Sequence, residues 1–191
     1  MAITFQDGDK LRRFLFSIDQ DIAGRVRSAG CKHCGGILHS ALYPRVALDA
    51  AERSSARSAS RISFCCDTCR KRTTPASVRY MGRRRYSTTA MILLSAARNE
   101  IAGSRLAALR VTLGVTRRTL ERWCRWWQDD FVLTPLWRTE QGRFMPPLPR
   151  DALPLALWDR FIGEDAGTRL FHLLRFLLPL SGPGMFTSNE A

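Results

Sequence analysis

Residues 31–36 read CKHCGG, and residues 64–69 read FCCDTC. Each stretch holds two cysteines with two residues between them, a spacing that lets both thiolates of one turn reach the same metal ion. Two such pairs complete the four sulfur ligands of a tetrahedral zinc site. We therefore predict a small β zinc ribbon. The expected ligands of its structural Zn²⁺ are Cys31, Cys34, Cys66 and Cys69.

The doublet Cys65–Cys66 leaves one ligand position open to a choice. We prefer Cys66 because this residue has the two-residue spacing to Cys69. Residues 62–66 read as the start of a strand, in which neighbouring side chains point to opposite faces. Cys65 would then point away from the ion.

Other interpretations of the cysteine pairs stay open. His33 and His39 are available as substitute ligands, although each is more simply a surface residue. The segment from Gly35 to Cys65 is longer than the usual separation of about 15–20 residues. Residues 40–60 would have to supply the longer excursion, as a flexible loop or as a short helix around Leu48–Arg57. Reversible disulfides are the competing chemistry, but no thioredoxin-like βαβ pattern surrounds either pair.

The rest of the chain is predicted to be mainly α-helical. Apolar residues recur at spacings of three and four near the N-terminus, at Leu11, Phe14, Leu15, Ile18, Ile22 and Val26, which is typical of an amphipathic helix. Short strands are expected at residues 77–81 and 85–87. The expected organisation is an N-terminal helix in residues 1–30, the zinc ribbon in 31–87, a helix-turn-helix in 88–128, a Pro-rich extended linker in 129–150, and C-terminal helices with a disordered tail in 151–191.

Residues 104–127 read SRLAALRVTLGVTRRTLERWCRWW and have the outline of a helix-turn-helix. Gly114 stands where the turn between two helices needs a positive φ. Thr116 is placed to cap the second helix, Arg117–Gln128. One residue departs from the usual pattern, because Arg110 occupies a position four before the turn glycine where a small residue is usual.

The second helix of this unit is predicted to be two-sided at about 100° per residue. Its apolar side chains are Leu120, Trp123, Cys124 and Trp127. The opposite side can enter the major groove of DNA, where arginine forms bidentate hydrogen bonds with guanine or contacts phosphates. The residues expected to contact DNA are Thr116, Arg117, Arg118, Arg122 and Arg125. The competing interpretation is a solvated face, since arginines are ordinary on the wet side of an amphipathic helix.

The distribution of charge supports a polyanionic partner. The chain has 30 basic and 17 acidic residues, for a net charge of +13. Residues 53–125 contain 17 of the basic residues and three of the acidic ones, whereas both ends are nearly neutral. An arginine run in this middle third, Arg83, Arg84 and Arg85, is a further candidate for phosphate or minor-groove contact. A solvated turn is the equal alternative.

Taken together, CKHCGGILH, FCCDTCRKRTTPASVRYMGRRRYS and RTLERWCRWW resemble the zinc-ribbon and helix-turn-helix front end of insertion-sequence transposases. They resemble still more a group of bacterial transposon-associated proteins. The resemblance covers about residues 10–128, and residues 40–60 depart from the shorter basic segment of those proteins. It implies binding to element-end DNA, with the four cysteines holding zinc.

Catalysis is not expected. The usual transposase partner is a domain in which three carboxylates hold two metal ions. The segment after Gln128 is too short for such a domain, and its acidic residues lie in the expected linker or around short helices. The C-terminal helices are expected either to mediate self-association through Leu170, Phe171, Leu173, Leu174 and Leu177 or to pack on the N-terminal helix.

The sequence therefore predicts a non-catalytic, zinc-stabilised DNA-binding protein of a mobile element, as a transposase-like accessory protein or a remnant. A transcriptional regulator and an RNA- or protein-binding zinc-ribbon module are the alternatives. The expected partner is double-stranded DNA, with a second copy of the chain or a catalytic transposase subunit. No membrane and no small-molecule substrate are expected. The N-terminus lacks a secretory pattern and no apolar run is long enough to span a bilayer, so we expect a cytoplasmic, nucleoid-associated location.

Overall fold

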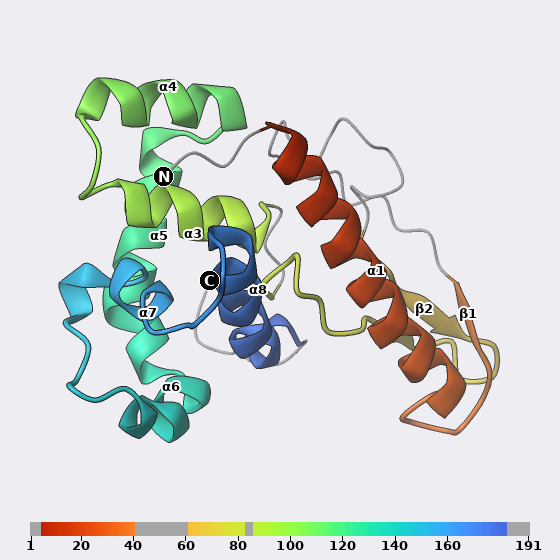
Figure 1. The fold of residues 1–191 in the computed structure, drawn as a ribbon. Helices are drawn as coiled ribbons and strands as arrows, with labels where there is room; N and C mark the ends of the chain where they lie inside the picture. Colours follow the sequence, from red (N-terminus) through yellow and green to blue (C-terminus); the bar gives the residue numbers. More distant parts are fainter. Residues whose placement is uncertain (1–4, 41–60, 83–85, 183–191) are drawn as a thin grey trace.

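A long helix, α1 (Phe5–Ala29), connects a small sheet to a group of shorter helices (Figure 1). The computed structural model describes residues 5–40, 61–82 and 86–182. The sheet has three antiparallel strands in the order β1-β2-β3. They are β1 (Leu38–Ser40), β2 (Phe64–Cys66) and β3 (Arg72–Thr73). The predicted fold class, mainly helical with a small β ribbon that carries four cysteines, is confirmed.

The helices after the sheet begin with α3 (Thr88–Ala97), α4 (Gly103–Leu113) and α5 (Arg117–Arg125). A π-helical turn, Trp126–Asp130, and a 3-10 turn, Phe131–Leu133, prolong α5. They are followed by α6 (Pro135–Glu140), α7 (Leu155–Trp158) and α8 (Ala166–Phe176), with 3-10 turns at Gln141–Arg143, Arg150–Ala152 and Leu178–Ser181. The region 88–128, where helices were expected, is therefore helical, and α5 with the turn that prolongs it covers the helix expected at Arg117–Gln128.

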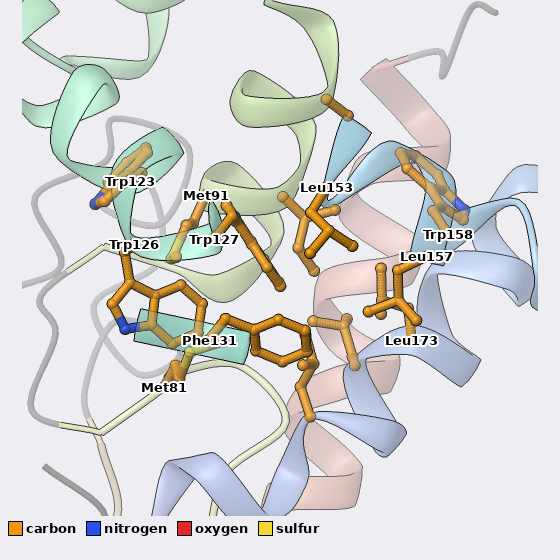
Figure 2. Close-up of a cluster of buried hydrophobic side chains, with 14 of the residues drawn as sticks. Met81, Met91, Trp123, Trp126, Trp127, Phe131, Leu153, Leu157, Trp158 and Leu173 are labelled. Atoms are coloured by element: carbon orange, nitrogen blue, oxygen red, sulfur yellow. The ribbon is translucent and has the colours of Figure 1, made fainter. Parts of the chain in front are cut away.

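The main hydrophobic core lies among these helices. Trp123, Trp127 and Phe131 of α5 and its continuation belong to this core, together with Leu157 of α7 and Leu173 of α8. Figure 2 shows Phe131 between Trp126 on one side and Leu157 and Leu173 on the other, with Trp123 at the edge away from these leucines. The rings of Trp127 and Phe131 meet edge to face, with centroids 4.9 Å apart. Burying side chains of this size contributes roughly 1.5–3 kcal/mol each, so this aromatic cluster is the main stabilising element of the helical part.

A second, smaller core belongs to the sheet. It consists of Ala23 on α1 and four residues of the ribbon, Cys31, Leu38, Phe64 and Cys66. The first half of α1 packs instead on the main core, where Phe14 meets Phe171 of α8 edge to face at 5.1 Å. One helix thus contributes to both cores, and it fixes the ribbon relative to the helices.

Residues 129–150 differ from the extended linker that their prolines suggested. Phe131, Val132 and Trp137 of this segment are buried in the main core. Thr134 caps α6 by accepting a hydrogen bond from the N–H of Trp137, and Pro135 occupies the first turn, where a missing N–H costs nothing. Proline here starts a helix, and the aromatic residues around it form core.

The leucines considered for self-association lie inside the chain's own core. Leu170, Leu173, Leu174 and Leu177 are all at most 2% exposed. They pack against the rest of the main core, which corresponds to the second of the two expectations for these helices.

A buried ion pair lies where α1, the ribbon and the helices meet. The Asp19 carboxylate accepts hydrogen bonds from Arg79 Nε at 2.8 Å, from the Ser77 hydroxyl at 2.6 Å and from the Val78 N–H at 2.8 Å. Asp19 and Arg79 are 4% and 2% exposed. The strand expected at residues 77–81 is absent, because the backbone here bends around this carboxylate instead of pairing with a neighbouring strand.

Several sequence expectations fall outside the described residues. They are the short helix around Leu48–Arg57, the arginine run 83–85 and the tail beyond residue 182. The strand expected at 85–87 is not formed by its two described residues, Tyr86 and Ser87, because Ser87 instead caps α3.

Replacing Asp19 with Asn should destabilise the protein strongly. The amide would leave the buried Arg79 guanidinium without a counter-charge, and breaking a buried pair in this way costs about 3–5 kcal/mol. The free energy of unfolding can be measured by urea denaturation followed by circular dichroism. Asp21→Asn on the same helix, where Asp21 is exposed, is the matched control. Equal unfolding midpoints for the two variants would contradict a central role for this pair.

Candidate metal centre and nucleic-acid interface

The four predicted cysteine ligands converge. The sulfur atoms of Cys31, Cys34, Cys66 and Cys69 all lie within 4.8 Å of one another. Two short separations join the two CxxC turns, or knuckles, to each other, at 3.6 Å between Cys31 and Cys69 and 3.5 Å between Cys34 and Cys66. Each knuckle therefore contributes two sulfurs to one shared centre.

This arrangement fits a tetrahedral metal ion. Zinc–sulfur bonds of about 2.3 Å in a tetrahedron place sulfurs about 3.8 Å apart, close to the separations found here. A disulfide needs sulfurs about 2.05 Å apart, and all six cysteines are free thiols. Because sulfurs of different knuckles approach each other to 3.5–3.6 Å, the geometry favours one shared ion over a disulfide within each CxxC pair.

The backbone of the two knuckles is built in the same way. Gly35 follows Cys34 with φ +73°, and Arg70 follows Cys69 with φ +58°. The Gly35 N–H donates to the carbonyl of Cys31 at 2.7 Å and closes the first turn. In the second turn the left-handed position is held by a non-glycine residue, a conformation that costs an L-amino acid roughly 1–2 kcal/mol.

Gly36 lets the knuckles approach each other. A Cβ on this residue would lie 2.7 Å from the Thr68 hydroxyl and 2.9 Å from the sulfur of Cys66. Any side chain at this position would separate the two turns, so the second glycine of CKHCGG is required by close packing.

Cys65 lies outside the cluster. It pairs with His39 on β1 and Arg72 on β3, and its thiol lies within 3.5 Å of the carbonyl of Arg70. Alternation along β2 turns it away from the centre that Cys66 faces. The choice of Cys66 over Cys65 agrees with this geometry, and neither His33 nor His39 belongs to the cluster.

The thiols of the centre differ in acidity. The backbone N–H of His33 is the main cause that lowers the pKa of Cys31 to about 7. For Cys69, the Lys71 N–H lowers the pKa, but burial and the neighbouring thiols outweigh it and raise the pKa to about 12. The pKa of Cys66 is also raised, because burial and the thiol of Cys34 outweigh the N–H of Cys69. Without a cation, crowded thiols resist joint ionisation.

The turn between α4 and α5 is formed as predicted. Gly114 adopts φ +67° and its N–H donates to the carbonyls at the end of α4. Thr116 caps α5 by accepting a hydrogen bond from the N–H of Thr119 at 3.2 Å. Arg110, the residue that departs from the usual pattern, donates from its guanidinium to the Val115 carbonyl at 3.3 Å. Its long side chain therefore reaches the turn between α4 and α5.

α5 has one buried side and one exposed side. Leu120, Trp123 and Cys124 are buried, and Trp123 also meets Tyr86 edge to face at 5.1 Å. The arginine face of α5, defined as Arg117, Arg118, Arg122 and Arg125, is exposed. The predicted division of this helix into a packing side and a solvent side is thus observed.

One acidic residue lies within this arginine face. Glu121 accepts a hydrogen bond from Arg117 Nε at 2.8 Å. That bond is the main cause that lowers the pKa of Glu121, and the charges of Arg98 and Arg125 lower it further. Arg98, at the end of α3, therefore extends the cationic surroundings of α5. Sequence reasoning missed this arginine because it lies at the end of α3, and no local pattern joins it to α5.

The two candidate sites are separate. Figure 1 shows β1 and β2 at one end of the molecule and α4 and α5 at the other. The run Arg83, Arg84 and Arg85 lies outside the described residues. Arg79, one of the cations of the middle third, is buried against Asp19 and is not available to a ligand.

Comparisons of the chain with protein-family models, curated proteins and solved structures found no match. Within residues 5–40, 61–82 and 86–182, no helix has both the length and the apolar character that crossing a membrane requires.

Changing Cys66 to Ser should abolish metal binding, whereas Cys65→Ser should leave it intact. The first removes a sulfur from the converging set, and the second alters a neighbour that points elsewhere. The metal-to-protein ratio, measured by native mass spectrometry after reconstitution with Zn²⁺, distinguishes the two. Loss of metal from the Cys65 variant alone would show that the doublet had been assigned the wrong way round.

Metal affinity should rise with pH. Cys66 and Cys69 have raised pKa values in the metal-free protein, so both thiols are protonated at neutral pH, and binding must release these protons. Acid favours the protonated, metal-free form. Competition against a chromophoric chelator at several pH values measures the affinity, and calorimetry in two buffers measures the protons released. Equal affinity in mildly acidic and mildly alkaline buffer would refute this coupling.

Proposed function

We propose that this protein is a zinc-stabilised, non-catalytic protein that binds double-stranded DNA, with α5 in the major groove. The observation that carries the proposal is the arginine face of α5, which stands exposed beside a capped turn while the opposite side of the same helix is held by the tryptophan core. A rigid helix with cationic side chains on its free side matches the way a helix-turn-helix reads base edges and phosphates.

The N-terminal end of α5 adds to this proposal. Thr116 and Arg117 are exposed at the first turn, where the backbone N–H groups and the helix dipole favour a phosphate. Because Arg117 already pairs with Glu121, we assign it to phosphate positioning. Arg118, Arg122 and Arg125 are then the candidates for contacts with base edges.

The role proposed for zinc is structural. All four sulfurs of the cluster would be ligands, which leaves no open coordination position for a substrate or water. The ribbon has a core of few residues, and a structural zinc site can contribute on the order of 10 kcal/mol to folding. The ion would therefore hold the ribbon and the last turns of α1 together.

The mobile-element part of the proposal rests on the resemblance of the cysteine knuckles and the helix-turn-helix to the front end of insertion-sequence transposases. We propose an accessory protein or remnant that binds element-end DNA, with a catalytic transposase subunit or a second copy of the chain as its protein partner.

Selection of bound duplexes from genomic fragments, with metal content measured on the same sample, tests the function. Recovery of the ends of a mobile element supports the whole proposal. Recovery of promoters would make the protein a transcriptional regulator, and a preference for structured RNA over duplex DNA would reject the role of α5.

Arg122→Ala should weaken binding to a selected duplex by roughly 1–3 kcal/mol and relax the preference at one position of the site. The side chain is exposed on α5, so folding should not change. Fluorescence anisotropy against the selected duplex and single-base variants of it measures both effects. Arg138→Ala, an exposed arginine on α6, is the control. Unchanged discrimination among these duplexes would remove α5 from the reading role.

A further inference from the structure

The ribbon carries a basic surface of its own. Lys32, Arg70 and Lys71, which we call the ribbon basic surface, are exposed on the two knuckles. Residues 31–40 and 61–73 contain five basic residues and one acidic residue, Asp67. None of these cations belongs to the arginine face of α5.

The metal centre holds the ribbon basic surface together. The sulfurs of Cys31 and Cys69 lie 3.6 Å apart, and Lys32 and Arg70 directly follow these two cysteines. Residues from segments 38 positions apart are therefore brought to the same part of the ribbon. Lys71 adjoins them, and its carbonyl accepts a hydrogen bond from the Cys66 N–H at 3.1 Å.

Arg70 occupies a backbone position that favours glycine. Its φ is +58°, and the matching residue of the first knuckle is Gly35, with φ +73°. Glycine adopts this left-handed conformation without a steric penalty, whereas an L side chain does not. Arg70 is present although glycine would fit this backbone conformation better, which indicates that the arginine side chain has a functional role.

Neutralising the metal centre does not account for all of this charge. A divalent ion with four thiolates carries a charge of −2, which two cations offset. The carboxylate of Asp67 offsets one more cation. Because these segments hold four exposed cations, Lys32, Arg70, Lys71 and Arg72, one positive charge is left over on the exposed side of the ribbon.

We propose that the ribbon basic surface contacts the phosphate backbone of the same DNA duplex that α5 reads. This inference rests on the proposed function and adds a second contact to it. Phosphate contacts set position and affinity but carry no sequence information. The ribbon would thus raise affinity for every duplex equally, and α5 would supply the preference for one site.

The test compares three full-length, zinc-loaded proteins: the unchanged chain, Arg70→Gly/Lys71→Gln, and Arg138→Gln/Arg175→Gln. The last pair removes the same charge from exposed positions on α6 and α8. Anisotropy titrations over a range of salt concentrations use a selected duplex and a duplex of unrelated sequence. Hydroxyl-radical footprints of the selected duplex accompany them.

The ribbon variant should bind both duplexes more weakly, and the slope of log affinity against log salt should fall by about one for each phosphate that the ribbon no longer neutralises. Protection should disappear at one edge of the footprint and persist under α5. Metal content should not change, and thermal stability should stay equal or rise, because glycine fits the turn at position 70. The control pair should keep the slope of the unchanged chain.

Equal slopes for the ribbon variant and the unchanged chain would overturn this inference and leave the proposed function intact. Loss of metal from the ribbon variant would also overturn it, because the cations would then serve the centre and not DNA. If the unchanged chain binds neither duplex, the proposed function fails, and this inference fails with it.

Discussion

The buried contact between Asp19 and Arg79 is the interaction on which the arrangement of the whole molecule depends. Asp19 belongs to the long helix, and Arg79 belongs to the segment that leaves the ribbon for α3. The same carboxylate accepts from Ser77 and Val78, and the Ser77 N–H donates to the Ser181 hydroxyl near the end of the described chain. Segments far apart in sequence therefore meet around the buried carboxylate of Asp19.

This junction shows that the arginines of the chain have different roles, because some are buried and stabilise the fold while others are exposed. Arg79 is structural, and its guanidinium also lies over the ring of Phe16, 4.8 Å from the centroid. Arg61, just before β2, donates to backbone carbonyls of Pro75 and Ser181. Other arginines stand exposed, among them those of the arginine face of α5 and Arg70 of the second knuckle. The net charge therefore overestimates the positive charge exposed to a ligand, because residues such as Arg79 and Arg61 use their guanidinium groups for contacts within the fold.

Local patterns predicted the parts of the structure that depend on short-range geometry. The two-residue spacing identified Cys66 over Cys65, and Gly114 with Thr116 located the turn and cap of the helix-turn-helix. The same reasoning was wrong for residues 129–150, because Pro135 starts a helix instead of interrupting one. Phe131 and Trp137 were the better signal, since large aromatic residues are buried on average.

The ion pair was missed because its partners are far apart in sequence, and no local pattern joins them. A signal was available, however. Asp19 falls four residues after Leu15 and four before Ala23, both of which are buried, so it lies within the apolar stripe of its helix. An acid in such a stripe predicts a buried cation. Pairing it with Arg79 required the tertiary structure.

The long helix α1 has a consequence for how the molecule opens. Its early turns pack beside α8, while its last turns pack on the sheet that carries the four-cysteine cluster. Withdrawal of the ion would free the last turns from their neighbours but leave the early ones held, so backbone amides would exchange with solvent in a gradient along a single helix. The exchange rates of amides in the last turns of α1 would then report whether the sheet is folded.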